Sequence, residues 1–224
     1  MTKIGVIGVG KWGINHLRLY KELECELIGI ADSDKSKEAL ARENNIQFFS
    51  NYNDLLPLVD AVSIVTPTDT HYQVIKDCLN AGKHVYAEKP ITLDHKQAQE
   101  LIELARKNNL ILNVGYLYRF NAVVRELKKF IKDIGEIHYI TARYIHSNKP
   151  PRKDAGAIFN LGIHLIDILN FVLDKRPMKI YAKKHNYLSK DKEECASLLL
   201  DYGNFHANLE LSSLHPEKKR DMWV

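Results

Sequence analysis

The chain has 224 residues, a length that suits one large domain or two small ones. Hydrophobic residues make up 45% and charged residues 27% of the sequence, which excludes disordered, collagen-like and coiled-coil chains. The formal net charge is +4, but Lys and Arg are interspersed with Asp and Glu, so no nucleic-acid partner is indicated. The densest basic cluster, Glu217-Lys218-Lys219-Arg220, is interpreted as a solvated face and is assigned no function.

Cysteines and apolar segments bear on the cellular compartment. Cys25, Cys78 and Cys195 are widely spaced and form no C-x-x-C pair, which predicts neither disulfides nor zinc and favours a reducing cytoplasm. The N-terminus runs directly into a strand pattern, so no export signal is expected. Residues 155–173 are apolar, but polar residues interrupt them, so no membrane span is expected either.

The first half of the chain alternates strand and helix patterns. Apolar strands are predicted at residues 3–8, 27–31, 61–65, 83–87 and 110–114, with helices near residues 14–20, 35–42, 69–80 and 93–107. Apolar strands that alternate with helices are typical of a parallel sheet covered on both faces. The pattern predicts an α/β fold, a doubly wound parallel sheet of the Rossmann kind, over residues 1–120.

The second half has a different order of elements. A helix at residues 122–132 precedes a strand at 136–145, the apolar helix at 155–173, and strands at 178–185, 195–201 and 205–212. Tyr202-Gly203-Asn204 is a turn that suits a hairpin between the last two strands. Residues 121–224 are therefore predicted to form an α+β domain with a mainly antiparallel sheet. Residues 221–224 resemble the opening of another strand, which indicates a truncated chain or a sheet covered by a partner subunit.

A glycine-rich motif lies between the first predicted strand and helix. Its sequence is Gly8-Val9-Gly10-Lys11-Trp12-Gly13, or G-x-G-x-x-G. The three glycines allow a tight turn, close approach of a pyrophosphate and close helix packing, and the helix N-terminus donates N–H groups to phosphates. Asp32 ends the next strand 24 residues after Gly8, where a carboxylate accepts hydrogen bonds from an adenosine ribose. A tight turn with Asp32 capping the next helix is the alternative.

The carboxylates after the second strand bear on the choice of cofactor. Asp32 would repel a 2′-phosphate, and Asp34 adds to this repulsion. NAD is therefore favoured over NADP.

Glu88-Lys89-Pro90 follows the predicted strand at residues 83–87, at the edge where open α/β sheets bind ligands. A lysine held there between cofactor and substrate can exchange a proton with a hydroxyl. An exposed lysine that begins a loop is the alternative.

The apolar helix carries one polar stripe. Relative to Asn160, His164 falls at about 40° and Asp167 at about −20° around the helix axis, so the three share a face. Because unpaired polar groups inside hydrocarbon are unfavourable, this face is expected to meet water, a partner or a substrate. A histidine satisfied within the core is the alternative.

Several motifs occur together in one order along the chain. They are the Gly8 to Gly13 motif, Thr66-Pro67-Thr68 with His71, Glu88-Lys89-Pro90, Arg119-Phe120, Ile134-Gly135-Glu136-Ile137, and Gly162-x-His164-x-x-Asp167. This order resembles the glucose-fructose oxidoreductase, inositol dehydrogenase and MocA family. The resemblance implies a Rossmann domain for NAD(P) and an α+β domain whose open-faced sheet mediates homo-oligomerisation. It also implies that the chain is short, because family members run on for about another hundred residues.

The resemblance also implies roles for individual residues. Lys89 matches the family's active-site lysine and His164 its histidine. Many members have Asp where this chain has Asn160, and an amide is no general base. Asn160 and Trp12 together resemble the branch that oxidises C3 of UDP-N-acetylglucosamine-type sugars.

The expected reaction is hydride transfer between a sugar hydroxyl carbon and the nicotinamide. His164 is the first candidate for the base and Lys89 for stabilising the oxygen, with the reverse assignment open. The predicted substrate-binding residues are Asn160, Asp167, Tyr116, Tyr118 and Arg119. The predicted cofactor-binding residues are Gly8, Gly10, Lys11, Trp12, Gly13, Asp32, Thr66, Pro67, His71, Glu88 and Lys89, and no metal is expected.

Two of these roles have specific alternatives or partners. Thr66 and His71 are expected to border the nicotinamide, and Asp167 to fix the ring of His164. Arg119 is alternatively an ion-pair residue at the domain boundary.

Two other functions stay open. One is a glycosidase that uses bound NAD for transient oxidation followed by elimination. The other is a non-catalytic sensor that binds a dinucleotide and a protein partner.

Overall fold

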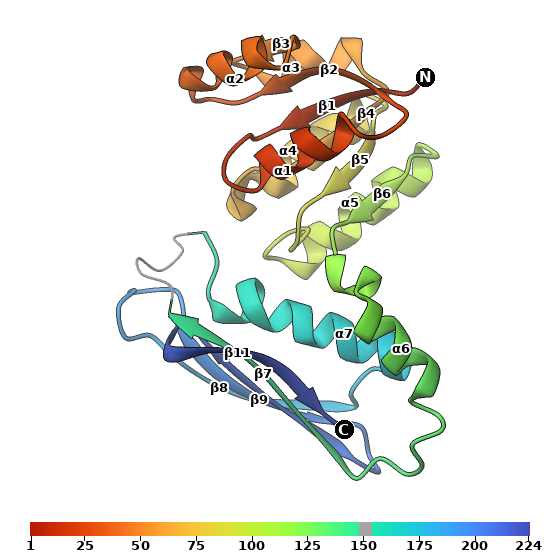
Figure 1. Cartoon of the computed structure of the whole chain (residues 1–224), viewed down its shortest axis with the longest axis vertical. Helices are drawn as coiled ribbons and strands as arrows, with labels where there is room; N and C mark the ends of the chain where they lie inside the picture. Colours follow the sequence, from red (N-terminus) through yellow and green to blue (C-terminus); the bar gives the residue numbers. More distant parts are fainter. Residues whose placement is uncertain (148–153) are drawn as a thin grey trace. The chain divides into compact units, whose positions relative to one another are not determined.

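The computed structural model describes residues 1–147 and 154–224, which divide into two compact units, Met1–Gly115 and Tyr116–Val224. Each unit has its own sheet (Figure 1). Each unit also has its own hydrophobic core.

The N-terminal unit is built on a six-stranded parallel sheet in the order β3-β2-β1-β4-β5-β6. Its strands are β1 (Lys3–Ile7), β2 (Glu26–Ala31), β3 (Gln47–Phe49), β4 (Ala61–Ile64), β5 (His84–Ala87) and β6 (Leu112–Val114). Its helices are α1 (Gly13–Tyr20), α2 (Glu38–Glu43), α3 (Tyr52–Leu55), α4 (His71–Asn80) and α5 (His95–Lys107). The predicted doubly wound sheet is confirmed. The short elements β3 and α3 were not predicted, because three or four residues carry too little periodicity.

Helices cover both faces of this sheet. Successive residues of a strand point to opposite faces, so Val6 packs in one core with Leu17 and Ala41, from α1 and α2. Its neighbour Ile7 packs in the other core, which is formed largely by α3, α4 and α5. Burial on both faces explains why the strands read as uninterrupted apolar runs.

Helix α5 shows how local chemistry sets a boundary. It begins at His95, two residues after the predicted start, because Asp94 is its N-cap. The Asp94 carboxylate accepts hydrogen bonds from the backbone N–H groups of Lys96 (2.7 Å) and Gln97 (3.4 Å).

The C-terminal unit has a five-stranded sheet in the order β11-β7-β10-β9-β8. Its strands are β7 (Tyr139–Ser147), β8 (Lys179–His185), β9 (Cys195–Asp201), β10 (His206–Ser212) and β11 (Leu214–Trp223), and its helices are α6 (Ala122–Phe130) and α7 (Ile163–Leu173). Among the described strands of this unit, only β7 and β10 pair in parallel, which confirms the mainly antiparallel α+β prediction.

In two details, the structure of this unit differs from the prediction made from the sequence. The strand predicted at residues 136–145 is shifted to Tyr139–Ser147. Residues 221–223 do not open a new strand, because they form the end of the ten-residue strand β11, which pairs with β7.

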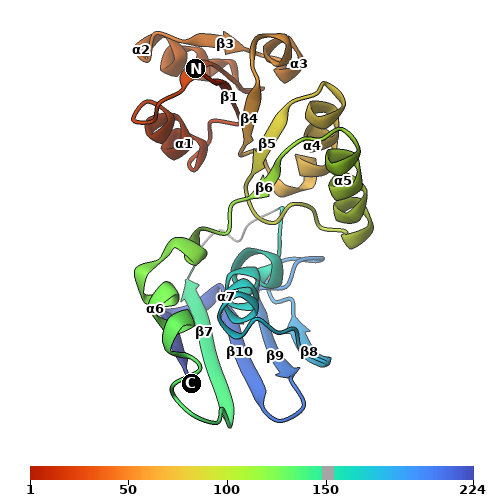
Figure 2. The same cartoon turned by 90° about the vertical axis from the view of Figure 1, so that its right-hand side faces the viewer.

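One face of the five-stranded sheet packs against α7 (Figure 2). Alternate residues of β10, Ala207, Leu209 and Leu211, are buried on that face together with Leu165 and Leu169 of α7. The opposite face has a broad depression of about 900 Å³, whose lining includes Tyr139, Tyr181 and Trp223. Each of these three side chains is exposed.

None of the helices in the described part of the chain combines the length and apolarity needed to cross a bilayer. The apolar segment at residues 155–173 forms α7 and a π-helical turn, Ile158–Gly162, that precedes it. Cys25, Cys78 and Cys195 are free thiols.

Candidate active site

The glycine motif forms the turn between β1 and α1. Gly8 has φ +88°, and a Cβ there would lie 2.8 Å from the carbonyl carbon of Val65. A Cβ on Gly13 would lie 2.0 Å from the Gly8 carbonyl oxygen, whereas a Cβ on Gly10 would meet no protein atom within 4 Å among the residues described. Gly8 and Gly13 therefore serve the turn itself, and Gly10 leaves space beside it.

Asp32 follows β2 and contacts the same turn. One carboxylate oxygen accepts a hydrogen bond from the Val9 N–H at 2.8 Å, and the other accepts from the Asp34 N–H at 2.9 Å. The carboxylate thus lies against the glycine turn, as a ribose-binding group in a Rossmann fold requires. Lys11 and Trp12 of the turn are exposed.

Lys89 lies just after β5, beside a partly buried chain of polar residues. The carboxylate of Glu88 lies 3.2 Å from His16 Nε2, and His16 Nδ1 lies 2.8 Å from the hydroxyl of Ser63. Ser63 is completely buried on β4, and His16 lies on α1. The chain joins the helix after the glycine turn to the segment that carries Lys89. The Lys89–Pro90 peptide bond is cis.

Thr66 and Pro67 follow β4, and His71 begins α4. His71 is only 1% exposed, and its two ring nitrogens lie 2.8 Å and 2.9 Å from the carbonyl oxygens of Pro90 and Thr66. It therefore bridges the loops after β4 and β5.

In the C-terminal unit, His164 is enclosed by aromatic rings. It is 6% exposed and lies on α7. The ring of Tyr118 meets it edge-on with centroids 5.0 Å apart, and the ring of Tyr144 stacks on it at 5.8 Å. The pKa of Tyr144 is raised, mainly because burial disfavours the charged phenolate, so the hydroxyl stays protonated at neutral pH. These two rings restrict the orientation of the imidazole.

Arg119 and Asp167 form a two-pronged ion pair. Arg119 Nε lies 2.9 Å and 3.0 Å from the two carboxylate oxygens, and Nη2 lies 2.5 Å from one of them. The guanidinium also lies over the ring of Tyr116. Burial is the main reason why the pKa of Tyr116 is raised. The structure thus gives Asp167 a partner on the Leu117–Phe120 turn, and the expected contact of Asp167 with the ring of His164 stays a prediction.

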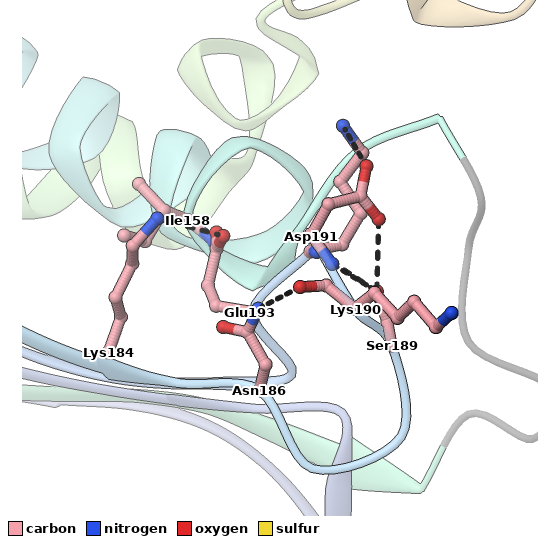
Figure 3. Close-up of polar contacts among 8 residues, drawn as sticks. Ile158, Lys184, Asn186, Ser189, Lys190, Asp191 and Glu193 are labelled. Atoms are coloured by element: carbon pink, nitrogen blue, oxygen red, sulfur yellow. Dashed lines mark hydrogen bonds and ion pairs between the residues drawn. The ribbon is translucent and has the colours of Figure 1, made fainter.

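The helical segment that carries Asn160 and His164 starts against Glu193 (Figure 3). The side chain of Glu193 is 8% exposed. Its carboxylate accepts a hydrogen bond from the Ile158 N–H at 2.9 Å and lies 3.9 Å from Lys184 Nζ. A Cβ on Gly156 would lie 2.3 Å from the Glu193 carboxyl carbon, so a larger residue does not fit there. A carboxylate at a helix N-terminus satisfies free N–H groups. Glu193 thereby fixes the start of the π-helical turn that holds Asn160.

The predicted residues fall into one group in each unit. In the N-terminal unit the glycine turn, Asp32, Thr66 and Lys89 follow β1, β2, β4 and β5, which are neighbours in the sheet. Parallel strands bring these residues to one edge. In the C-terminal unit, Tyr118, Arg119 and Asp167 contact one another or His164. Lys89 and His164 belong to different units, so their meeting at one nicotinamide stays a prediction.

Sequence reasoning missed four residues near these groups: His16, Tyr144, Glu193 and Arg220. Each reaches its partner across a long stretch of chain, and an isolated His, Tyr, Glu or Arg gives no local pattern. The one available signal was the position of His16, one helical turn after Gly13.

A glycine turn with a carboxylate at the edge of a parallel sheet, followed by an α+β unit, defines a protein with a dinucleotide-binding Rossmann domain. Residues 2–116 match the profile described as "Oxidoreductase family, NAD-binding Rossmann fold", and residues 124–224 match the "GFO/IDH/MocA C-terminal domain". The chain belongs to the Gfo/Idh/MocA oxidoreductase family, and its N-terminal unit is an NAD(P)-binding domain. The resemblance seen in the sequence is confirmed.

Individual relatives share both sequence and fold with this chain. It is 33% identical to the UDP-N-acetylglucosamine 3-dehydrogenase of Acidithiobacillus ferrooxidans, across 99% of this chain and 70% of that protein. A solved structure of that enzyme superposes with a TM-score of 0.89 at 32% identity, covering 99% of this chain and 72% of the other. The inositol 2-dehydrogenase/D-chiro-inositol 3-dehydrogenase of Lactiplantibacillus plantarum is 28% identical, across 82% of this chain and 56% of that protein.

More distant structures share the fold. The WlbA dehydrogenase from Bordetella pertussis, in complex with NADH and UDP-GlcNAcA, has a TM-score of 0.90 at 20% identity, across 99% of this chain and 75% of the other. The chain spans between 56% and 70% of the length of the two sequence relatives named above.

Proposed function

We propose that this protein transfers a hydride reversibly between a sugar carbon that bears a hydroxyl and the nicotinamide of NAD. The substrate is a nucleotide sugar of the UDP-N-acetylglucosamine type, oxidised at C3. The observation that carries the proposal is the position of Lys89, which follows β5 on the sheet edge that also holds the glycine turn. The 33% identity to a UDP-N-acetylglucosamine 3-dehydrogenase supports the choice of substrate.

The residues of the N-terminal unit fit a dinucleotide. The open space at Gly10 suits a pyrophosphate, and the carboxylate of Asp32 suits the ribose hydroxyls. When bound, NAD supplies the hydride acceptor.

Proton transfer and charge stabilisation are assigned to the chain's own side chains. His164 accepts the proton of the substrate hydroxyl, and Lys89 stabilises the negative charge that develops on the same oxygen; the reverse assignment is the alternative. Asn160 orients the sugar by hydrogen bonding, because its amide cannot act as a base. Tyr118 and Tyr144 hold the imidazole of His164, and Arg119 with Asp167 fixes the turn that carries Tyr118.

A substrate screen tests the proposed function. The purified protein is incubated with NAD and a panel of UDP-sugars and free sugars, and NADH is followed by its absorbance. We expect NADH to accumulate with at least one UDP-sugar. Bound cofactor that cycles without net NADH while a glycosidic bond is cleaved favours the glycosidase alternative. Absence of any hydride transfer across the panel favours the sensor.

The choice of NAD over NADP rests on Asp32. We expect Asp32→Ala to weaken NAD binding by roughly tenfold or more, because a hydrogen bond to a charged group contributes about 1.5–3 kcal/mol. The same change relaxes the exclusion of NADP, since the repulsive carboxylate is gone. Titration of both dinucleotides measures the two affinities. Asp34→Ala is the matched comparison: the Asp34 carboxylate accepts a hydrogen bond from the Ser36 N–H and is assigned only the weaker repulsion, so this change should keep the NAD affinity and relax the exclusion of NADP less than Asp32→Ala does. An unchanged NAD/NADP ratio in Asp32→Ala contradicts the assignment.

The open face of the five-stranded sheet is proposed as the surface for homo-oligomerisation. The exposed rings of Tyr139, Tyr181 and Trp223 lie on this face. Aromatic side chains contribute much of the binding energy at protein interfaces. Light scattering should therefore give a mass above that of one chain, and Tyr181→Lys should lower it. A monomeric wild-type protein contradicts the assignment.

We also place the protein in a reducing cytoplasm, which suits its three free thiols.

A further inference from the structure

Arg220 lies on the same face of its sheet as His164. It belongs to β11 and stands directly opposite Tyr144 of β7 in the antiparallel pairing. Residues opposite each other in a sheet point to the same face, and Tyr144 packs in the core beneath α7. The next residue, Asp221, points to the other face, where its carboxylate binds Arg143 at 2.9 Å and 2.6 Å.

Two tyrosines hold the guanidinium of Arg220. Its Nη1 lies 3.2 Å from the hydroxyl of Tyr118, and its central carbon lies 4.4 Å from the centre of the Tyr144 ring. The same two rings pack on the imidazole of His164. Arg220 is therefore one side chain removed from the candidate catalytic histidine, and its position is set by the groups that orient that histidine.

The charge of Arg220 is not compensated by a carboxylate. Three other basic residues of this unit are paired with carboxylates: Arg119 binds Asp167, Arg143 binds Asp221, and Lys219 binds Glu217. Within residues 1–147 and 154–224, Arg220 forms no ion pair, and its side chain is exposed to solvent. A cation that is pre-positioned, exposed and uncompensated favours an anionic ligand.

We propose that Arg220 binds a phosphate group of the substrate, the diphosphate of a nucleotide sugar, and so selects anionic over neutral sugars. This inference rests on the proposed function, because the sugar is taken to react at His164. The planar guanidinium donates two parallel hydrogen bonds to phosphate oxygens, a geometry that lysine lacks. The face of Tyr144 reduces the freedom that Arg220 loses on binding. Arg220 therefore differs in role from its sequence neighbours, although the sequence pattern of residues 217–220 is typical of a solvated face.

Binding of UDP tests this role without requiring turnover. Isothermal titration with UDP is carried out on the wild type, Arg220→Met, Arg220→Lys and Lys218→Met. We expect Arg220→Met to weaken UDP binding by roughly tenfold or more, and Arg220→Lys to recover part of the loss. Lys218→Met removes an equal charge from an exposed residue two positions away and should change the affinity less than about twofold.

Two further measurements separate the possible sources of the effect. NAD affinity should be the same in all four proteins, because the dinucleotide pyrophosphate is assigned to the glycine turn. A fall in NAD affinity with Arg220→Met would assign Arg220 to the cofactor and overturn the proposal. Equal UDP affinity in the wild type and Arg220→Met would also overturn it, provided that both proteins melt at the same temperature.

Failure of the reaction and failure of this site give different results. If UDP binds through Arg220 but no sugar is oxidised, the anion site stands and the proposed dehydrogenase function is wrong. If a neutral sugar or polyol is oxidised and UDP does not bind, the dehydrogenase function stands and the role of Arg220 is wrong.

Discussion

Lys89→Ala and His164→Ala are each expected to lower the turnover of the sugar substrate by at least about a hundredfold, the effect of losing a positioned proton-transfer group. The reason differs for the two residues. In the proposed mechanism, His164 removes the hydroxyl proton as hydride leaves, whereas Lys89 stabilises the charge on the oxygen. Initial rates of NADH formation at saturating NAD measure both effects. The affinity for NAD should stay close to that of the wild type in His164→Ala, because this residue is assigned to proton transfer.

Matched controls separate chemistry from folding. Lys96→Ala and His185→Ala remove the same side chains from exposed positions on α5 and β8 and should retain wild-type turnover. Near-normal turnover in both active-site variants, on a substrate that the wild type oxidises, would refute the assigned roles. The pH profile adds a second test: loss of the base should remove the limb of the profile that reports its deprotonation.

The second large effect is expected at Gly13. Its Cβ in Gly13→Ala would lie 2.0 Å from the Gly8 carbonyl oxygen, so either the turn or α1 must move. Forced overpacking typically costs about 1–3 kcal/mol, and here the obstacle is backbone, which yields least. We expect a lower thermal midpoint and loss of measurable dinucleotide binding. Thermal unfolding and NAD titration give the two values.

Gly10→Ala is the matched comparison within the same turn. Its Cβ would meet no described protein atom within 4 Å, so the free energy of unfolding should change by no more than about 0.5 kcal/mol. The added methyl group enters the space proposed for the pyrophosphate, so NAD binding should weaken while the melting temperature is retained. A Gly13→Ala protein that melts like the wild type would contradict the packing argument.

The sequence was sufficient to predict the long elements and the fold they form. Strands such as Ala61–Ile64 are buried on both faces, and their uninterrupted apolar residues indicate a parallel sheet directly. Prediction failed for short or irregular elements. The strand Gln47–Phe49 has three residues, and β11 pairs with β7 through a register shift between Leu214 and Lys219. A register shift depends on contacts between strands that are distant in sequence, which local periodicity does not contain.

The candidate site was predictable where one motif supplies all of its parts. The glycine turn and Asp32 depend on a single strand–helix–strand unit, so their spacing is visible in the sequence. The surroundings of His164 come from Tyr118 and Tyr144, and Glu193 holds the turn that precedes its helix. Only tertiary folding brings these segments together. The helical stripe did include Asp167, but the pattern could not show that Arg119 is its partner.

The partly buried contacts of His16 have a consequence for how this sequence can vary. Its two ring nitrogens serve Ser63 and Glu88, which lie 47 and 72 residues further along the chain. If one member is replaced by an apolar residue, a buried or partly buried polar group on another loses its hydrogen bond, and that loss destabilises the domain. Positions 16, 63 and 88 should therefore change in concert among descendants of this sequence. Drift at any one of them is constrained by the other two, and through Glu88 this constraint extends to the neighbourhood of Lys89.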